Sequence, residues 1–177
     1  MLSDAEWLAT RTGLDLLGGP FHVPGEAAAL AVEPTHVAAA ARTGARVVAA
    51  VGWPTGRHHS LVKAAEARLA VETGAHEVWL APDPDGDASA LLADIVAVRQ
   101  SVEVPLGVLW AGEASAEAAR LAGADALIVP ADAVLPATEL AVVVRGAAPG
   151  TASVVEHLER GASRVFTAPP ARAAAVR

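Results

Sequence analysis

Short apolar runs alternate along the chain with longer alanine-rich stretches in which polar residues recur. Each short run is apolar at nearly every position, which is typical of a strand buried on both faces of a sheet. The expected strands cover residues 27–32, 46–51, 77–81, 106–111, 126–129, 140–144 and 164–167. The longer stretches predict helices over residues 35–43, 60–73, 87–99, 115–122 and 151–160.

The junctions between these elements also repeat. Gly44, Gly74, Gly123 and Gly161 are each followed by alanine, and each separates an expected helix from the next strand. Glycine suits the left-handed turn that ends a helix. Most expected strands are followed instead by proline, which ends a hydrogen-bonded ladder. A repeated unit of strand, loop, helix and Gly-Ala turn predicts a parallel α/β fold, either a closed (β/α)8 barrel or an open doubly wound sheet.

The spacing favours a shortened barrel. The interval from Gly123 to Gly161 holds two expected strands but is too short for two full units, so a helix is short or missing there. A (β/α)8 barrel typically has about 250 residues. The chain has 177 residues, so we expect a trimmed parallel (β/α)8 barrel that forms one domain over residues 1–177.

Composition excludes several classes of function. The chain has 20 acidic and 13 basic residues, which argues against nucleic acid or an anionic membrane as a partner. It has no cysteine, which excludes a disulfide scaffold and a cysteine nucleophile. No apolar run approaches the ~18 residues of a membrane span, and the first residues lack the pattern of a signal peptide. We therefore expect a cytoplasmic protein.

Cofactor and metal motifs are weak or missing. The chain has no G-x-G-x-x-G, Walker A or G-x-S-x-G sequence, so we expect no cofactor. His58 and His59 are adjacent, with no third ligand at helical spacing, which favours a solvated loop over a metal site. Three aspartates alternate over residues 83–87 as in a calcium loop, but the twelfth position is Asp94 instead of glutamate. Turn and cap roles are the better interpretation there, and we expect no metal.

Several motifs occur in an order typical of one enzyme family. The chain has V-G-W-P-T-G at residues 51–56, V-K-A-A-E-A at 62–67 and G-A-H-E-V at 74–78. These resemble the V-G-F-P-x-G strand end, the V-K-x-x-E-A helix core and the G-A-D-E-V strand start of deoxyribose-phosphate aldolases. The resemblance runs from about residue 27 to 167. It implies a (β/α)8 barrel and a class I aldolase, which joins acetaldehyde to glyceraldehyde 3-phosphate through a lysine Schiff base. By this comparison the first strand is absent or reduced to residues 14–17.

The chain departs from the family at the positions that carry this chemistry. Val129 is matched to the Schiff-base lysine, Trp79 to the catalytic aspartate and Arg145 to the second lysine. A Schiff base requires a primary amine, which a guanidinium cannot supply. Lys63 is the only lysine. We expect it on the solvent-exposed face of its helix, opposite Val62, Ala65 and Leu69.

Three functions remain open. The chain could be a catalytically degenerate barrel with a structural or regulatory role, as a homo-oligomer or a hetero-oligomer. It could bind or convert a small sugar phosphate or aldehyde without a Schiff base, through Glu33, Asp83, Asp132 and Arg145. The chain could also be an active aldolase, which is a type of lyase.

The candidate pocket lies where the strands end, as in other barrels of this type. Its candidate residues are Glu33, Trp53, Trp79, Trp110, Arg145 and Thr167. An indole buries roughly 150–250 Å². We therefore expect Trp79 to fill much of this pocket, with Trp53 and Trp110 close by.

Overall fold

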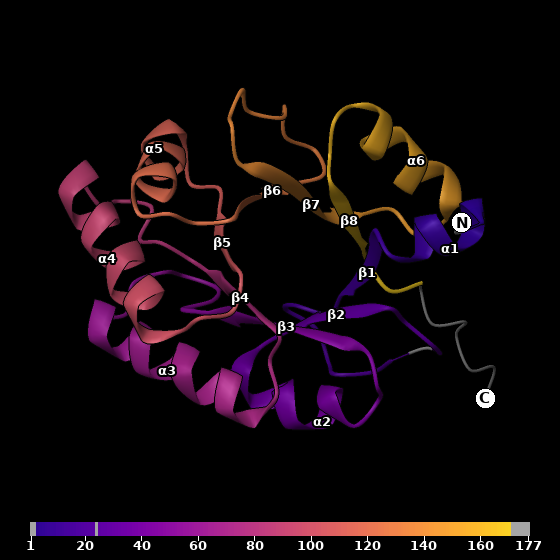
Figure 1. Ribbon diagram of the computed structural model, residues 1–177, viewed down its shortest axis with the longest axis horizontal. Helices are drawn as coiled ribbons and strands as arrows, with labels where there is room; N and C mark the ends of the chain where they lie inside the picture. The colour runs from indigo at the N-terminus through magenta and orange to yellow at the C-terminus, as the bar shows by residue number, and fades with distance from the viewer. Residues whose placement is uncertain (1–2, 24, 171–177) are drawn as a thin grey trace.

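The computed structural model describes residues 3–23 and 25–170, which form a closed barrel of parallel strands (Figure 1). Each strand pairs with the next along the chain, and the last pairs with the first. The predicted (β/α)8 barrel is confirmed, and the open-sheet alternative is wrong. The described residues contain eight strands: β1 (Thr12–Asp15), β2 (Ala29–Val32), β3 (Arg46–Val51), β4 (Glu77–Leu80), β5 (Leu106–Leu109), β6 (Ala126–Pro130), β7 (Ala141–Ala147) and β8 (Arg164–Thr167).

Helices surround the ring of strands (Figure 1). They are α1 (Asp4–Ala9), α2 (Val37–Ala41), α3 (Ser60–Thr73), α4 (Ala88–Ser101), α5 (Glu113–Leu121) and α6 (Thr151–Glu159), with a 3-10 turn η1 (Pro34–His36) before α2. Residues 131–140 join β6 to β7 without a helix, as their spacing predicted. None of the described helices has the length and apolar character needed to cross a membrane.

The first strand is present, so the expectation that it is absent or reduced to residues 14–17 was wrong. β1 is short and contains Gly13, and it closes the barrel between β2 and β8. A Cβ on Gly13 would lie 2.4 Å from the Phe166 ring. Position 13 therefore has to be glycine, because a side chain from the other end of the chain lies against it. The glycine interrupts the apolar run that would otherwise indicate a strand.

The barrel interior is filled by small residues around two aromatic rings. Trp79 and Phe166 are fully buried and meet edge to face, with ring centroids 4.7 Å apart. On the neighbouring strand β5, Gly107 pairs with Trp79, and a Cβ there would lie 2.9 Å from the Trp79 ring and 2.7 Å from Ile128. A large indole fits because its neighbours are small, and the interior is a packed core.

Candidate functional site

A polar cluster lies where the strands end. Asp15 is the last residue of β1, and its carboxylate forms an ion pair with Arg145 of β7, with 2.8 Å between Oδ2 and Nη2. The Arg145 guanidinium also lies over the Trp53 ring, 4.5 Å from the ring centroid. We call Asp15, Glu33, Trp53 and Arg145 the mouth cluster.

Burial changes the acidity of this cluster. Asp15 is buried, and the loss of solvent raises its pKa above the usual value of 3.8. The Arg145 charge and the Leu17 N–H, which donates to Oδ1, act in the opposite direction, whereas the charge of Glu33 adds to the rise. A carboxyl group with a raised pKa beside a fixed cation is suited to proton transfer.

The mouth cluster has unused hydrogen-bonding capacity. Glu33 follows β2 directly, and its Oε1 accepts a hydrogen bond from the Gly18 N–H at 2.7 Å. Its Oε2 lies 3.4 Å from His36 Nδ1. Among the described residues, neither Glu33 Oε2 nor Arg145 Nε has a hydrogen-bond partner, although both atoms are buried. The cluster therefore contains one acceptor and one donor that are buried and have no partner among the described residues.

The structure brings together three of the six predicted pocket residues, namely Glu33, Trp53 and Arg145. Trp79 lies in the barrel interior instead, and its indole N–H donates to Glu77 at 2.9 Å, toward the amino-terminal end of β4. Trp110 packs in the shell between the strands and the helices. Thr167 is buried and follows the inward-facing Phe166, so the alternation of a strand directs it away from the interior.

The position matched to the Schiff-base lysine needs a correction. Val129 is buried in the outer shell, against the helices, whereas its neighbour Ile128 faces the barrel interior. Counting the Gly-Ala-Asp motif from Gly123 also places residue 128 at the inward position. The interior residue of β6 is therefore Ile128, which carries no amine.

Lys63 lies outside the barrel wall, and the prediction that it is exposed was wrong. Only 1% of it is accessible to solvent, and its ammonium contacts Asp94 Oδ2 of α4 at 2.6 Å. Val62 and Leu69, expected on the packed face, are 55% and 63% exposed. Helix α3 packs through Lys63, Ala67 and Ala70, so its buried face is rotated away from the predicted one.

The histidine and aspartate loops have structural roles, and the cap of α3 is His59 instead of Ser60. His59 caps α3, where its Nδ1 accepts a hydrogen bond from the Leu61 N–H, and Asp87 caps α4. Asp83 forms an ion pair with Arg57 near the surface, and Asp132 is exposed in the segment between β6 and β7. Within the described part of the chain, no group of three or more histidines and carboxylates could hold a metal ion.

Asp15 was missed from the sequence because the first strand was not recognised. The signal was an acidic residue after the apolar Leu14, at the point where a short strand ends. His36 was missed as well, since its place beside Glu33 depends on the turn η1.

Comparisons with known proteins agree with this fold and with the sequence motifs. No family model matches the chain. The deoxyribose-phosphate aldolase of Nocardia farcinica is 57% identical over 61 residues, which is 32% of this chain and 28% of that protein. The enzyme of the same name from Corynebacterium glutamicum is 48% identical over 73 residues, or 39% and 33% of the two chains. The matched stretches thus span about a third of each relative.

Solved structures extend the likeness in fold to most of the chain. The tetrameric deoxyribose-phosphate aldolase of Aeropyrum pernix has a TM-score of 0.66 at 16% identity and covers 90% of this chain and 86% of its own. An aldolase called QR15 has a TM-score of 0.69 at 18% identity, covering 80% and 77%. The fold is that of a (β/α)8 barrel. Over the matched stretches, the sequence is similar to those of deoxyribose-phosphate aldolases.

Proposed function

We propose that this chain is a deoxyribose-phosphate-aldolase-like barrel that does not carry out the Schiff-base reaction. The observation that carries the proposal is the place of Lys63, the only side-chain primary amine. A carbonyl substrate must reach a neutral amine to form the carbinolamine. The Lys63 amine is buried between α3 and α4 and paired with a carboxylate. It is closed to substrate.

The residues at the end of the barrel do not replace it. Ile128 and Trp79 are apolar and buried where an inward lysine and a catalytic carboxylate would act. Arg145 carries a guanidinium, which cannot form a Schiff base. The chain therefore keeps the barrel while lacking the nucleophile of a class I aldolase.

A coupled assay for cleavage of deoxyribose 5-phosphate to acetaldehyde and glyceraldehyde 3-phosphate tests this proposal. The expected result is no turnover by the wild type under conditions in which the Nocardia farcinica aldolase is active. Turnover that disappears in a folded Lys63→Arg variant would overturn the proposal. Turnover that survives Lys63→Arg would assign a lysine-independent lyase reaction to the mouth.

The mouth cluster favours a second function, the binding of a small sugar phosphate or hydroxylated aldehyde. Buried Glu33 Oε2 can accept a hydrogen bond from a ligand hydroxyl, and Arg145 Nε can donate one to a ligand oxygen. A charged guanidinium is well suited to a phosphate group. This cluster is the reason to place ligand binding ahead of a purely structural or regulatory role, alone or in an oligomer.

Thermal unfolding with deoxyribose 5-phosphate and with glyceraldehyde tests this second function. A ligand that binds only the folded state raises Tm by mass action. We expect the shift in the wild type and a smaller one in Arg145→Gln and Glu33→Gln. No shift, or equal shifts in the wild type and both variants, would favour the structural or regulatory role.

A further inference from the structure

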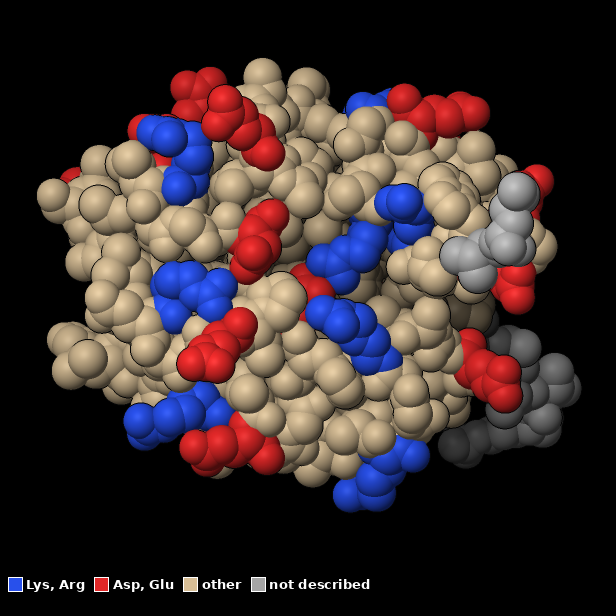
Figure 2. Space-filling view, viewed as in Figure 1, with Lys and Arg blue, Asp and Glu red and all other residues tan. Residues whose placement is uncertain are grey.

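A second cavity lies at the opposite, amino-terminal end of the barrel. It has a volume of about 550 Å³ and is bounded by the turn between α1 and β1 and by the first residues of β3, β4 and β8. In Figure 2, basic and acidic side chains lie next to one another around the centre of this face. Three arginines and one glutamate line it: Arg11, Arg46, Arg164 and Glu77. None of these residues belongs to the mouth cluster.

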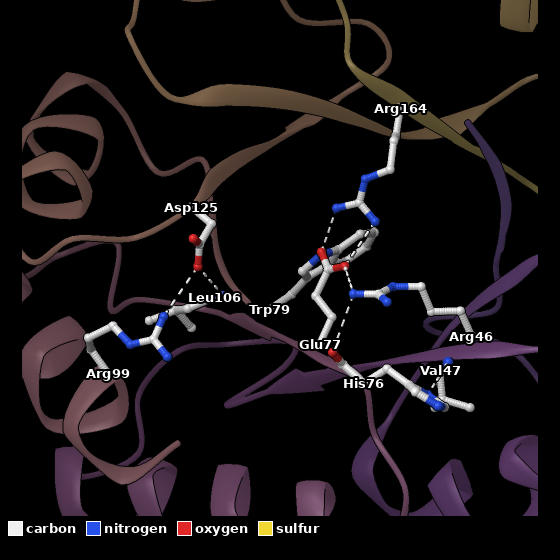
Figure 3. A network of polar contacts seen from close by, with 9 residues as sticks. All are labelled: Arg46, Val47, His76, Glu77, Trp79, Arg99, Leu106, Asp125 and Arg164. Carbon is white, nitrogen blue, oxygen red and sulfur yellow. Dashed lines mark hydrogen bonds and ion pairs between the residues drawn. The ribbon is translucent and has the colours of Figure 1, made fainter. Parts of the chain in front are cut away.

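The single acid in this cavity is already engaged. Glu77 is 2% exposed and accepts two hydrogen bonds from Arg164, at 2.9 and 2.6 Å, and one from the Trp79 indole at 2.9 Å (Figure 3). The two parallel hydrogen bonds balance the charge of Glu77 with that of Arg164 and fix the orientation of the Arg164 guanidinium. Glu77 thus neutralises one of the three arginines.

The other two arginines are loosely held. Arg46 is 3.6 Å from Glu77 Oε2, and its one hydrogen bond, to the His76 carbonyl, is 3.4 Å long. Arg11 stacks on Trp7 and donates from Nη1 to the Ser163 carbonyl, but its buried Nε has no partner among the described residues. The three arginines and one glutamate therefore give the cavity a net charge of two positive units. Some N–H groups of Arg11 and Arg46 remain without a hydrogen-bond acceptor among the described residues.

We propose that this cavity binds a small organic phosphate, of the phosphomonoester class. A phosphomonoester carries close to two negative charges at neutral pH, which match the excess of two guanidinium groups. Arg11 and Arg46, the two arginines that Glu77 does not neutralise, both line this cavity.

The remaining lining suits a carbon skeleton. Ala29, Pro105 and Phe166 give the cavity an apolar wall, and its volume exceeds what a bare phosphate ion needs. The hydroxyls of Thr10 and Thr12 are already engaged by main-chain carbonyls of α1. Recognition thus rests on the arginines for the phosphate and on the apolar wall for the rest of the ligand.

Binding of ribose 5-phosphate, measured by calorimetry at constant ionic strength, tests the proposal. We expect millimolar or tighter binding that weakens at least about tenfold in Arg46→Gln and in Arg11→Gln, because each loses a charge-assisted contact. Arg68→Gln is the matched control, since it removes the same charge from the exposed surface of α3. This control should bind as the wild type does.

The indole signals of the wild-type protein give a second readout that needs no arginine variant. Trp7 contacts Arg11 and Trp79 contacts Glu77, whereas Trp53 lies in the mouth cluster. Ribose 5-phosphate should shift the indole N–H resonances of Trp7 and Trp79, whereas binding at the mouth cluster would shift that of Trp53.

Several results would overturn the proposal. These are no binding of ribose 5-phosphate at millimolar concentration, equal binding of succinate, and equal loss in Arg68→Gln. A shift confined to the Trp53 signal would show that the phosphate binds at the mouth alone. Failure here leaves the proposed lack of Schiff-base activity intact, because that rests on Lys63.

Discussion

Replacing Asp94 with asparagine would leave the Lys63 ammonium buried without its counter-ion. The two side chains are 1% and 7% exposed, and their charged atoms are 2.6 Å apart, so water screens the pair little. Removing one partner of a buried ion pair typically costs about 3–5 kcal/mol, because the remaining charge stays out of water. For a chain of this size, each kcal/mol lowers Tm by roughly 2–4 °C. We therefore expect Asp94→Asn to lower Tm by on the order of 10 °C.

Urea unfolding near neutral pH, followed by circular dichroism, measures this cost. The matched control is the double variant Lys63→Met with Asp94→Leu, which removes both charges and keeps the interface apolar. Such a replacement is often neutral or stabilising, so the double variant should be more stable than either single one. A cost below about 1 kcal/mol for Asp94→Asn would refute the reasoning, since the Lys63 amine would then reach water.

Three further predictions follow from the packing and the charges. Gly107→Ala places a methyl group against Trp79 and Ile128 and should destabilise the protein by about 1–3 kcal/mol in urea unfolding. Gly19→Ala is the control, because it has open space around it and should change the stability little. Equal effects of the two variants would contradict the interior packing. Burial raises the folded pKa of Asp15 above its unfolded value, so the stability that this group contributes is present at low pH and is lost as the pH rises through the folded pKa. The wild type should lose stability relative to Asp15→Asn as the pH rises from about 3 to 7, and a relative gain would show that Arg145 outweighs burial. Arg164→Leu removes the paired guanidinium from the buried Glu77 carboxylate and should lower the free energy of unfolding by several kcal/mol. Adding Glu77→Leu should restore most of this stability. If the double variant stays equally unstable, the loss comes from altered packing and not from the unpaired charge.

Most of the barrel could be predicted from the sequence because its signals are local. Each apolar run, the glycine after most helices and the proline after most strands lie within a few residues of the feature they specify. The first strand lacked such a signal. Gly13 of β1 leaves the space that the Phe166 ring of β8 fills, and these two residues come together only when the barrel closes.

The candidate site was predictable only in part, for the same reason. Glu33, Trp53 and Arg145 could be placed because each follows or ends an apolar run. The position of Lys63 could not, because α3 has apolar residues on two faces, and a periodic pattern then does not show which face is buried. Its partner Asp94 lies 31 residues further along the chain, on another helix.

Borohydride trapping with acetaldehyde, followed by intact mass and peptide mapping, tests the central claim most directly. An imine on a lysine side chain would be reduced to a stable adduct at that residue. The buried, paired amine of Lys63 predicts no adduct on this side chain in the folded protein, and an adduct once the protein is unfolded in urea. An adduct mapped to Lys63 in the folded protein would show that the amine is open to substrate and would contradict the account.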